Sequence, residues 1–218
     1  VIVPSGKNIT INFAGFTYTV TKNLAGSAGT ESQCFQLLKN STIVMKNGTI
    51  KAGNQNVAIL IQNYSNLTLD HMTLDGSTMT RQDGTYALSN NNGEIKIADG
   101  TTITAQSGNG NIAMDVCWAE SYQDGARVTV EEGATINGDV ELGLWGQDTY
   151  DEGQSALTIT GGTVNGSLTV GDYGTGGNTD DKIAEVGKNV TISGGTITSE
   201  VPEVYLAPGF VQGEDKVV

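Results

Sequence analysis

Short runs of alternating apolar and polar residues recur along this chain, and most of them lead into a turn that contains glycine or asparagine. The clearest examples read LTITGGTV at 157–164 and VTISGGTIT at 190–198. A period of two residues places the apolar side chains of a strand on one face, which a core would bury. Glycine supplies the positive φ of a tight turn at no steric cost. Each phrase therefore predicts two short strands around a turn.

The phrase can be aligned seven times at intervals of 24 to 34 residues, and the copies begin at Ile9, Ile43, Leu67, Ile95, Val128, Leu157 and Val190. A third apolar run follows most copies, at 57–61, 112–116, 140–144 and 168–170. A sandwich predicts longer strands with two-residue turns, and a propeller blade needs about 40 residues or more. The pattern instead predicts an all-β fold, a right-handed parallel β-helix (a solenoid) of about seven coils with three short strands per coil.

The repeats extend along the whole chain, which predicts a single domain, 1–218. Residues 1–200 are expected to form the coils, and residues 201–218 a C-terminal cap or the start of a next module, because Pro202 cannot extend a strand ladder. Residues 21–34 carry no strand pattern and are expected to form a loop near the first coil. Asparagines between the strands are typical of corners, where their side chains bond locally.

Charge narrows the classes of partner. The formal net charge is −13, and an acidic chain repels phosphate backbones and anionic membrane surfaces, so we expect no nucleic-acid partner. No apolar run is long enough to span a membrane, which predicts no membrane insertion by this segment. Cys34 and Cys117 lie in apolar runs without metal-type spacing, which favours two buried free thiols.

Three long segments between the repeats, 117–126, 144–156 and 171–184, follow the third strand of a coil and precede the next copy. Insertions at one corner of successive coils line up along one edge of a solenoid. That edge would gather twelve candidate binding residues: Trp118, Tyr122, Asp124, Trp145, Asp148, Tyr150, Asp151, Glu152, Asp172, Tyr173, Asp180 and Asp181.

Aromatic rings beside carboxylates suit sugar recognition, because the rings stack on C–H faces and the carboxylates accept from hydroxyls. An extracellular polysaccharide or a host surface protein is therefore the expected partner. The same carboxylates are also suited to Ca²⁺, but no EF-hand or nonapeptide spacing is present, so no cofactor is predicted and the metal stays an open alternative. In the simpler interpretation, the aromatic residues cover the edge of the coils and the acids keep the loops solvated.

Catalysis has weaker support. A lyase of this architecture needs an Arg or Lys base beside acidic Ca²⁺ ligands, and the two arginines, Arg81 and Arg127, are expected in a surface turn and beside a strand. A paired-carboxylate hydrolase is suggested by NTDD at 178–181, but the single histidine, His71, lies far upstream in a turn. No residue is therefore predicted to be catalytic, and whether the chain is an enzyme stays open.

The ending ISGGTITSEVPEVYLAPGFVQGEDKVV (192–218) resembles β-helical segments of large adhesin-like surface proteins from Gram-positive gut bacteria, with Ile197 where Phe is common. The rest of the chain is similar to pectin-lyase-like β-helices at the level of fold. The resemblance implies a secreted or cell-surface location and a non-catalytic role in adhesion, in glycan or protein binding, or as a spacer. The alternative is a polysaccharide-active lyase or glycoside hydrolase that uses the acidic, aromatic edge.

Overall fold

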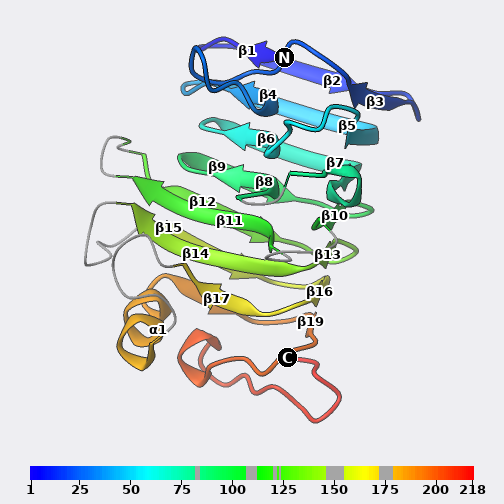
Figure 1. Ribbon diagram of the computed structural model, residues 1–218. Helices are drawn as coiled ribbons and strands as arrows, with labels where there is room; N and C mark the ends of the chain where they lie inside the picture. The colour runs from blue at the N-terminus through cyan, green and yellow to red at the C-terminus, as the bar shows by residue number, and fades with distance from the viewer. Residues whose placement is uncertain (82–83, 107–111, 120–121, 123, 146–154, 172–178) are drawn as a thin grey trace.

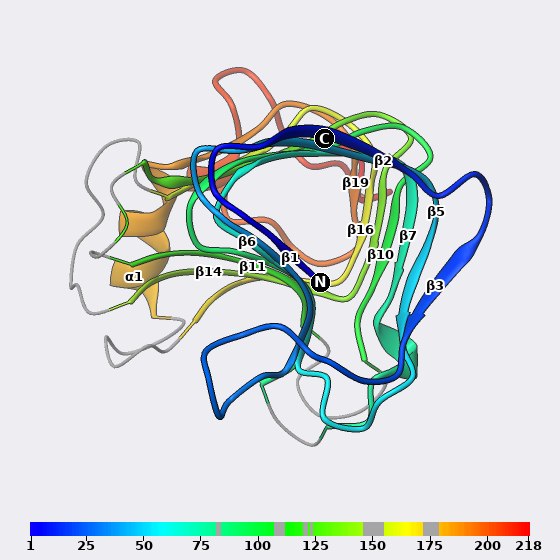
Figure 2. The same cartoon turned by 90° about the horizontal axis from the view of Figure 1, so that it is seen from above.

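The structure is a computed structural model that describes the chain except for residues 82–83, 107–111, 120–121, 123, 146–154 and 172–178. It is mostly β, and its strands stack in two sheets from the N-terminal end to the C-terminal end (Figure 1). Figure 2, seen along the stack, places the two sheets on opposite sides of a shared interior. The buried residues of both sheets form one hydrophobic cluster.

Parallel pairing joins all the strands of both sheets. The seven-stranded sheet consists, in spatial order, of β1 (Ile2–Val3), β4 (Gln33–Leu37), β6 (Ile59–Asn63), β8 (Tyr86–Asn90), β11 (Ile112–Ala119), β14 (Asp139–Trp145) and β17 (Leu168–Val170).

The twelve-stranded sheet holds the repeated phrase. Its strands are β2 (Asn8–Asn12), β3 (Thr17–Val20), β5 (Thr42–Ala52), β7 (Asn66–Asp75), β9 (Gly93–Ile97), β10 (Thr102–Thr104), β12 (Ala126–Val130), β13 (Thr135–Asn137), β15 (Ser155–Ile159), β16 (Thr163–Asn165), β18 (Val190–Ile192) and β19 (Thr196–Ile197). The copies that begin at Ile43 and Leu67 run straight through the predicted turn as single strands, β5 and β7, whereas the other five are split in two.

The register confirms the sequence alignment of the repeats. The first residues of the seven copies pair in one unbroken row: Ile9, Ile43, Leu67, Ile95, Val128, Leu157 and Val190. The five middle members of this row are at most 2% exposed. A second row consists of seven threonines on the polar side of the second strand: Thr17, Thr49, Thr73, Thr102, Thr135, Thr163 and Thr196.

The turns between the paired strands use left-handed backbone as predicted, though not only glycine. Gly133, Gly162 and Gly195 have φ of 79°, 79° and 96°. Asn47 and His71 take the corresponding places in β5 and β7, with φ of 57° and 52°. This conformation costs a non-glycine residue about 1–2 kcal/mol, and the cost is smallest for Asn because its short side chain forms local hydrogen bonds.

Buried asparagines join the two sheets at one corner. Asn63 Nδ2 donates to Ser65 O at 2.8 Å and to Asn90 Oδ1 at 2.9 Å, and Asn90 Nδ2 donates to Arg127 O at 3.0 Å. Asn63 and Asn90 are both 0% exposed. Because buried amides must be paired, these bonds stabilise each turn against the next one in the stack. The predicted corner role of asparagine is thus confirmed.

Two further predictions are confirmed, and one segment differs. Cys34 and Cys117 are buried free thiols. The loop expected over residues 21–34 is confirmed for 21–32, which hold no strand apart from one bridge between Ala25 and Gln33, whereas Gln33 and Cys34 already belong to β4. The segment 171–184, expected to be an irregular insertion, instead runs into an α-helix, α1 (Asp180–Gly187).

Helix α1 begins where the sequence offers a cap. Thr179 Oγ1 accepts from Lys182 N at 3.4 Å, and Asp180 and Asp181 lie in the first turn, where the helix dipole favours acids. The two remaining helices are short 3₁₀ turns, η1 (Gly76–Thr78) and η2 (Glu203–Tyr205). None of the helices in the described part of the chain is long and apolar enough to cross a membrane.

Residues 201–218 cover the C-terminal end of the stack. Leu206 forms a parallel bridge with Ile192 of β18, and Val217 forms an antiparallel bridge with Thr196 of β19. Tyr205 is completely buried beneath this segment. The bridges occupy part of the outer edges of β18 and β19, which would otherwise be free to pair with another chain.

Candidate functional site

A polar cleft of about 310 Å³ lies at the corner where β6 and β8 lead into β7 and β9. The corners that lead into β5, β7, β9 and β12 build it, and its lining residues are Asn40, Ser41, Tyr64, Ser65, Asn66, Asn92, Gly93, Glu94, Asp124 and Arg127. Tyr64 is the single aromatic residue in this set, and the others are polar, charged or glycine. The register of the strands brings the corners of successive repeats side by side. Residues that are 60 positions apart in the chain, such as Tyr64 and Asp124, therefore line the same cleft.

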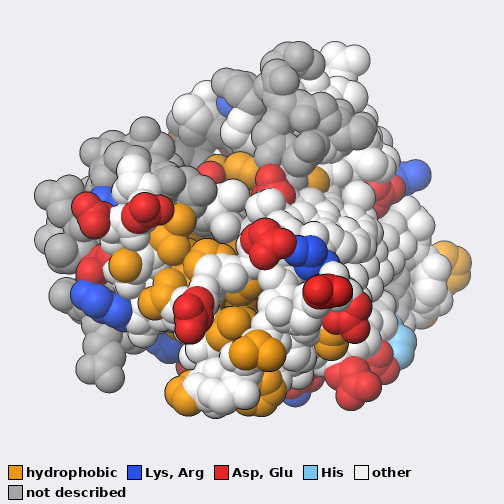
Figure 3. Space-filling model, turned by 90° about the horizontal axis from the view of Figure 1, so that it is seen from below, with side chains coloured by type: hydrophobic (Ala, Val, Ile, Leu, Met, Phe, Trp, Pro, Cys, Tyr) orange, Lys and Arg blue, Asp and Glu red, His pale blue; other side chains and the backbone are white. Residues whose placement is uncertain are grey.

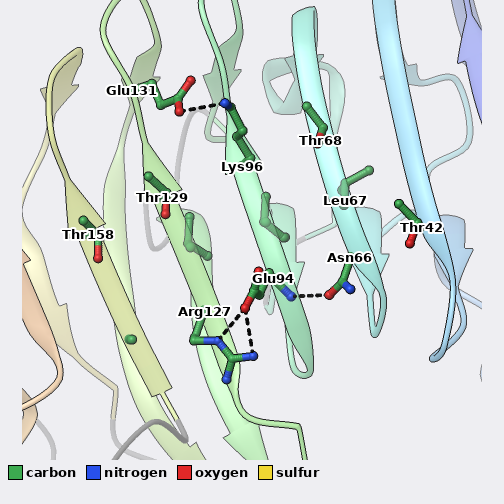
Figure 4. A pocket seen from close by; sticks show the side chains of 13 residues that line it. Thr42, Asn66, Leu67, Thr68, Glu94, Lys96, Arg127, Thr129, Glu131 and Thr158 are labelled. Atoms are coloured by element: carbon green, nitrogen blue, oxygen red, sulfur yellow. Dashed lines mark hydrogen bonds and ion pairs between the residues drawn. The ribbon is translucent and has the colours of Figure 1, made fainter.

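A shallower groove of about 430 Å³ continues from the cleft across the outer surface of the twelve-stranded sheet (Figure 4). The cleft and the groove share Asn66, Glu94 and Arg127. The groove crosses β7, β9, β12 and β15, so it runs along the stack rather than along a strand. Such a direction suits an elongated ligand whose units would each face a different repeat.

Ion pairs between neighbouring strands orient the charged groups of the groove. Arg127 Nε and Nη2 both lie 3.1 Å from Glu94 Oε1, and Arg127 Nη1 donates to Asp124 O at 2.7 Å. Lys96 Nζ lies 2.8 Å from Glu131 Oε1 (Figure 4). Exposed pairs of this kind add about 0–1 kcal/mol to stability. Their main effect is to hold a cation and a carboxylate at fixed positions on the surface.

The rim of the cleft carries two tyrosines. The rings of Tyr64 and Tyr122 are tilted by 45°, with centroids 4.9 Å apart. Burial, followed by the neighbouring Tyr122, raises the pKa of Tyr64 above its usual value, so Tyr64 keeps its phenolic proton at neutral pH. The pair therefore offers an aromatic face together with the neutral hydroxyl group of Tyr64.

Asp124 is held at the cleft by a reciprocal pair of hydrogen bonds. Asn92 Nδ2 donates to Asp124 Oδ2 at 3.0 Å, and Asp124 N donates to Asn92 Oδ1 at 3.2 Å. Asn92 is buried while Asp124 is exposed, so a rigid amide positions an accessible carboxylate. Together with Arg127 and Tyr64, this carboxylate gives the cleft an acceptor, a donor and a stacking surface.

A second polar cluster lies on the seven-stranded sheet. Gln62, Ser89, Asp115 and Glu141 pair in one row across β6, β8, β11 and β14. Gln62 Nε2 donates to Ser89 Oγ at 3.0 Å. Asp115 is 4% exposed, and its Oδ1 atom has no hydrogen-bond partner among the described residues. Burial, with the nearby Glu141 as a lesser cause, raises the pKa of Asp115 to about 8.

The structure describes only part of the predicted edge. Tyr122 packs on Tyr64 and Asp124 lines the cleft, whereas Asp180 and Asp181 lie in α1 and do not line it. Trp118 is the last residue but one of β11 and Trp145 is the last residue of β14, and Trp118 pairs with Leu144 and Trp145 with Ala119. The remaining candidates fall outside the described residues: Asp148, Tyr150, Asp151, Glu152, Asp172 and Tyr173. The shared edge therefore stays a prediction.

The residues weighed for catalysis have ordinary surroundings. His71 is exposed, as expected, but it lies inside strand β7 rather than in a turn, and its Nδ1 lies 2.6 Å from Asp70 Oδ1, which raises the pKa of His71. Arg127 is ion-paired beside its strand. Within the described ranges, no group of three or more His, Cys, Asp or Glu side chains is placed to hold a metal ion.

Comparisons with known proteins do not assign a family. No protein-family model matches the chain, and neither the curated proteins nor the solved structures contain a significant match. The similarity to pectin-lyase-like segments of surface proteins therefore stays a prediction, and the functional argument rests on the site itself.

Proposed function

We propose that the chain is a right-handed parallel β-helix of about seven coils. The proposal is supported by the two unbroken register rows, which advance by one repeat at each step, and by the order in which the chain visits the sheets. From β9 to β17, each repeat adds two strands to the twelve-stranded sheet and then one to the seven-stranded sheet. Repeats of this kind cannot bury their inward faces alone, so stacking is the source of their stability.

On this scaffold we propose a non-catalytic domain that binds an extracellular polysaccharide at the bacterial surface, as part of a secreted or wall-anchored protein. The observation that supports it best is the cleft with its continuing groove, where Tyr64, Asp124 and Arg127 combine stacking with fixed charged donors and acceptors. Sugars offer C–H faces and rows of hydroxyls, which such a surface can contact. The direction of the groove along the stack matches a polymer rather than a compact ligand.

Glycan-array binding followed by titration tests the proposal. Arg127→Ala removes the guanidinium shared by the cleft and the groove, and Asp124→Ala removes the exposed acceptor. A hydrogen bond to a charged group is worth about 1.5–3 kcal/mol, so each variant should weaken binding by roughly 10- to 100-fold. Lys188→Ala is the matched control, because it breaks the Lys188–Glu185 ion pair of α1 away from the cleft and should leave affinity unchanged.

Two results would contradict the proposal. The first is that the wild-type chain binds no polysaccharide on an array of bacterial, plant and host polysaccharides. That result would favour the alternative that the chain is a structural spacer. The second is binding that survives both cleft variants, which would place the site elsewhere, for example on the predicted edge that includes Asp151 and Asp172.

A polysaccharide-active enzyme is the second candidate, and one observation favours it. Asp115 and Glu141 are register partners, and the raised pKa of Asp115 would let that carboxyl keep its proton at neutral pH, as the acid of an acid–nucleophile pair must. Against it, Asp115 is only 4% exposed, so a substrate could not reach it in this conformation. Turnover of a uronate polymer that is lost in both Asp115→Asn and Glu141→Gln would establish this alternative.

A further inference from the structure

Two rows of side chains form the floor of the groove and run along the stack (Figure 4). The first row pairs in register as Thr68, Lys96, Thr129 and Thr158. The second row consists of Asn66, Glu94, Arg127 and Ala156. Neighbouring strands lie about 4.8 Å apart, so each row presents one side chain at roughly that interval. Hydroxyl and amide groups both donate and accept hydrogen bonds, so the floor offers neutral bonding groups beside its charged ones.

Each cation of the groove is already paired with a carboxylate from a neighbouring repeat. Arg127 directs Nε and Nη2 to Glu94 and Nη1 to the carbonyl oxygen of Asp124, so all three nitrogen atoms of its guanidinium have a partner. Lys96 Nζ is paired with Glu131 Oε1 at 2.8 Å. A carboxylate or sulfate on a ligand would therefore have to displace Glu94 or Glu131 before it could pair with either cation.

The net charge of the site is negative. Three carboxylates and two cations among the described residues line the cleft and the groove, which gives a formal charge of −1: Glu94, Asp124, Glu131, Lys96 and Arg127. The side chain of Asp124 is bonded to a neutral amide, that of Asn92. The chain as a whole carries −13, and Figure 3 shows acidic side chains spread over its C-terminal end. An anionic polymer would therefore approach this site against electrostatic repulsion.

We propose that the polysaccharide bound here is a neutral polymer in an extended conformation, without carboxylate, sulfate or phosphate groups on the units that face the groove. This ligand class rests on the proposed binding of a polysaccharide by the cleft and the groove. Sugar hydroxyls both donate and accept, so they can bond to the threonines, the amides and the outer atoms of the ion pairs without breaking the pairs. An extended chain places successive units over successive repeats, which matches the two rows of the floor.

Titration with matched polymers tests the ligand class in the intact chain. Each polymer that binds on the glycan array is compared in a carboxymethylated and a hydroxyethylated form of low substitution, because the two substituents are similar in size and differ in charge. Carboxymethyl and hydroxyethyl cellulose are one such pair. The hydroxyethylated form should bind more tightly by roughly fivefold or more, a ratio that corresponds to the repulsion between two like charges about 4 Å apart in water. Its affinity should change little between about 0.01 M and about 1 M salt, since screening acts on charges.

A charge variant of the chain gives the second comparison. Glu94→Gln combined with Glu131→Gln keeps the shape of both side chains and removes the carboxylates that pair with the two cations of the groove. This variant should gain affinity for the carboxymethylated form, relative to the hydroxyethylated form, by roughly fivefold or more. Glu203→Gln combined with Glu214→Gln is the matched control, because both residues are exposed, neither lines the groove and the change in net charge is the same. Its preference should remain that of wild type.

The results for the wild-type chain separate an error in the ligand class from an error in the proposed function. Carboxymethylated polymers that bind as tightly as the hydroxyethylated forms, or more tightly, would overturn the neutral ligand class and leave polysaccharide binding in place. Affinity for the hydroxyethylated form that falls steeply with ionic strength would have the same consequence. A chain that binds no polymer in any form would contradict the proposed function and the ligand class with it. These comparisons do not use the variants, so a variant that does not fold leaves the test intact.

Discussion

Asp115 should make the fold less stable as pH rises through neutrality. The carboxyl is 4% exposed with an unpartnered oxygen, and its pKa is raised from 3.8 in model compounds to about 8 by burial first and by Glu141 to a lesser extent. Below pH 4 the carboxyl is neutral in both the folded and the unfolded chain, so the stability that the buried neutral carboxyl contributes is fully present. Between about pH 4 and pH 8 the unfolded chain releases the proton while the folded chain keeps it, so stability falls with each unit of pH.

The magnitude follows from the size of the shift. Each pKa unit corresponds to 1.36 kcal/mol, so a shift of about four units gives a loss of at most about 6 kcal/mol between pH 4 and pH 8. The groups that face Asp115 are Ser89, which donates a hydrogen bond to the carboxyl, and Glu141, whose charge interacts with it. Above pH 8 the carboxyl is ionised in both states, and the slope from this residue disappears.

Asp115→Asn isolates the effect, because the amide keeps the shape of the carboxyl but cannot ionise. Urea unfolding of wild type and variant should be compared at half-unit steps from pH 5 to pH 9. We expect the variant to gain stability relative to wild type as pH rises, with the difference levelling off above about pH 8. Thr10→Asn, at an exposed position of β2, is the control and should show no such trend, because neither side chain ionises. A difference that stays constant over this range would refute the reasoning.

Three further predictions concern the stack and use urea unfolding as the measurement. Gly162→Ala should destabilise by more than Gly15→Ala, since both have positive φ but an added Cβ would lie 2.7 Å from two carbonyl oxygens only at Gly162; equal losses would contradict the tight turn. Ile136→Ala should lower the free energy of unfolding by about 2–5 kcal/mol because the side chain is completely buried. Ile11→Ala should lower it by clearly less, because Ile11 is only half-buried in β2. His71→Gly should stabilise by about 1 kcal/mol by relieving a φ of 52°, and a loss of stability would show that the exposed pair with Asp70 matters more.

The repeated phrase predicted much of the fold because its signal is redundant. The first residues of the seven aligned copies, from Ile9 to Val190, are the same residues that pair in register in the structure. Glycine turns such as the one at Gly133 could be predicted because a tight turn needs a residue with positive φ. Strands β4 and β8 were not predicted as members of the third set, since QCFQL and YALSN lack clean alternation. Helix α1 was missed because eight residues at the end of an insertion give too short a periodicity to stand out.

The cleft was harder to predict than the fold. Tyr64 and Asn92 lie outside the three insertions and were not predicted as binding residues, and Arg127 was considered only as a possible catalytic base. Only the register places Tyr64 beside Tyr122 and Asn92 beside Asp124. The burial of Asp115 was also not predicted, because alternation in IAMDV indicates a polar residue that faces away from the core, whereas the side chain is 4% exposed.

Distances between spin labels along the threonine row test the central claim, the parallel stacking of seven repeats in register. With both native cysteines replaced, cysteine pairs at Thr17 and Thr49, Thr17 and Thr102, and Thr17 and Thr196 span one, three and six register steps. Strands lie about 4.8 Å apart, so pulsed electron resonance should give separations that grow by about 4.8 Å per step, to about 29 Å across the whole row. Separations that do not increase in proportion to the number of steps would contradict the stack, and with it the cleft that is built on it.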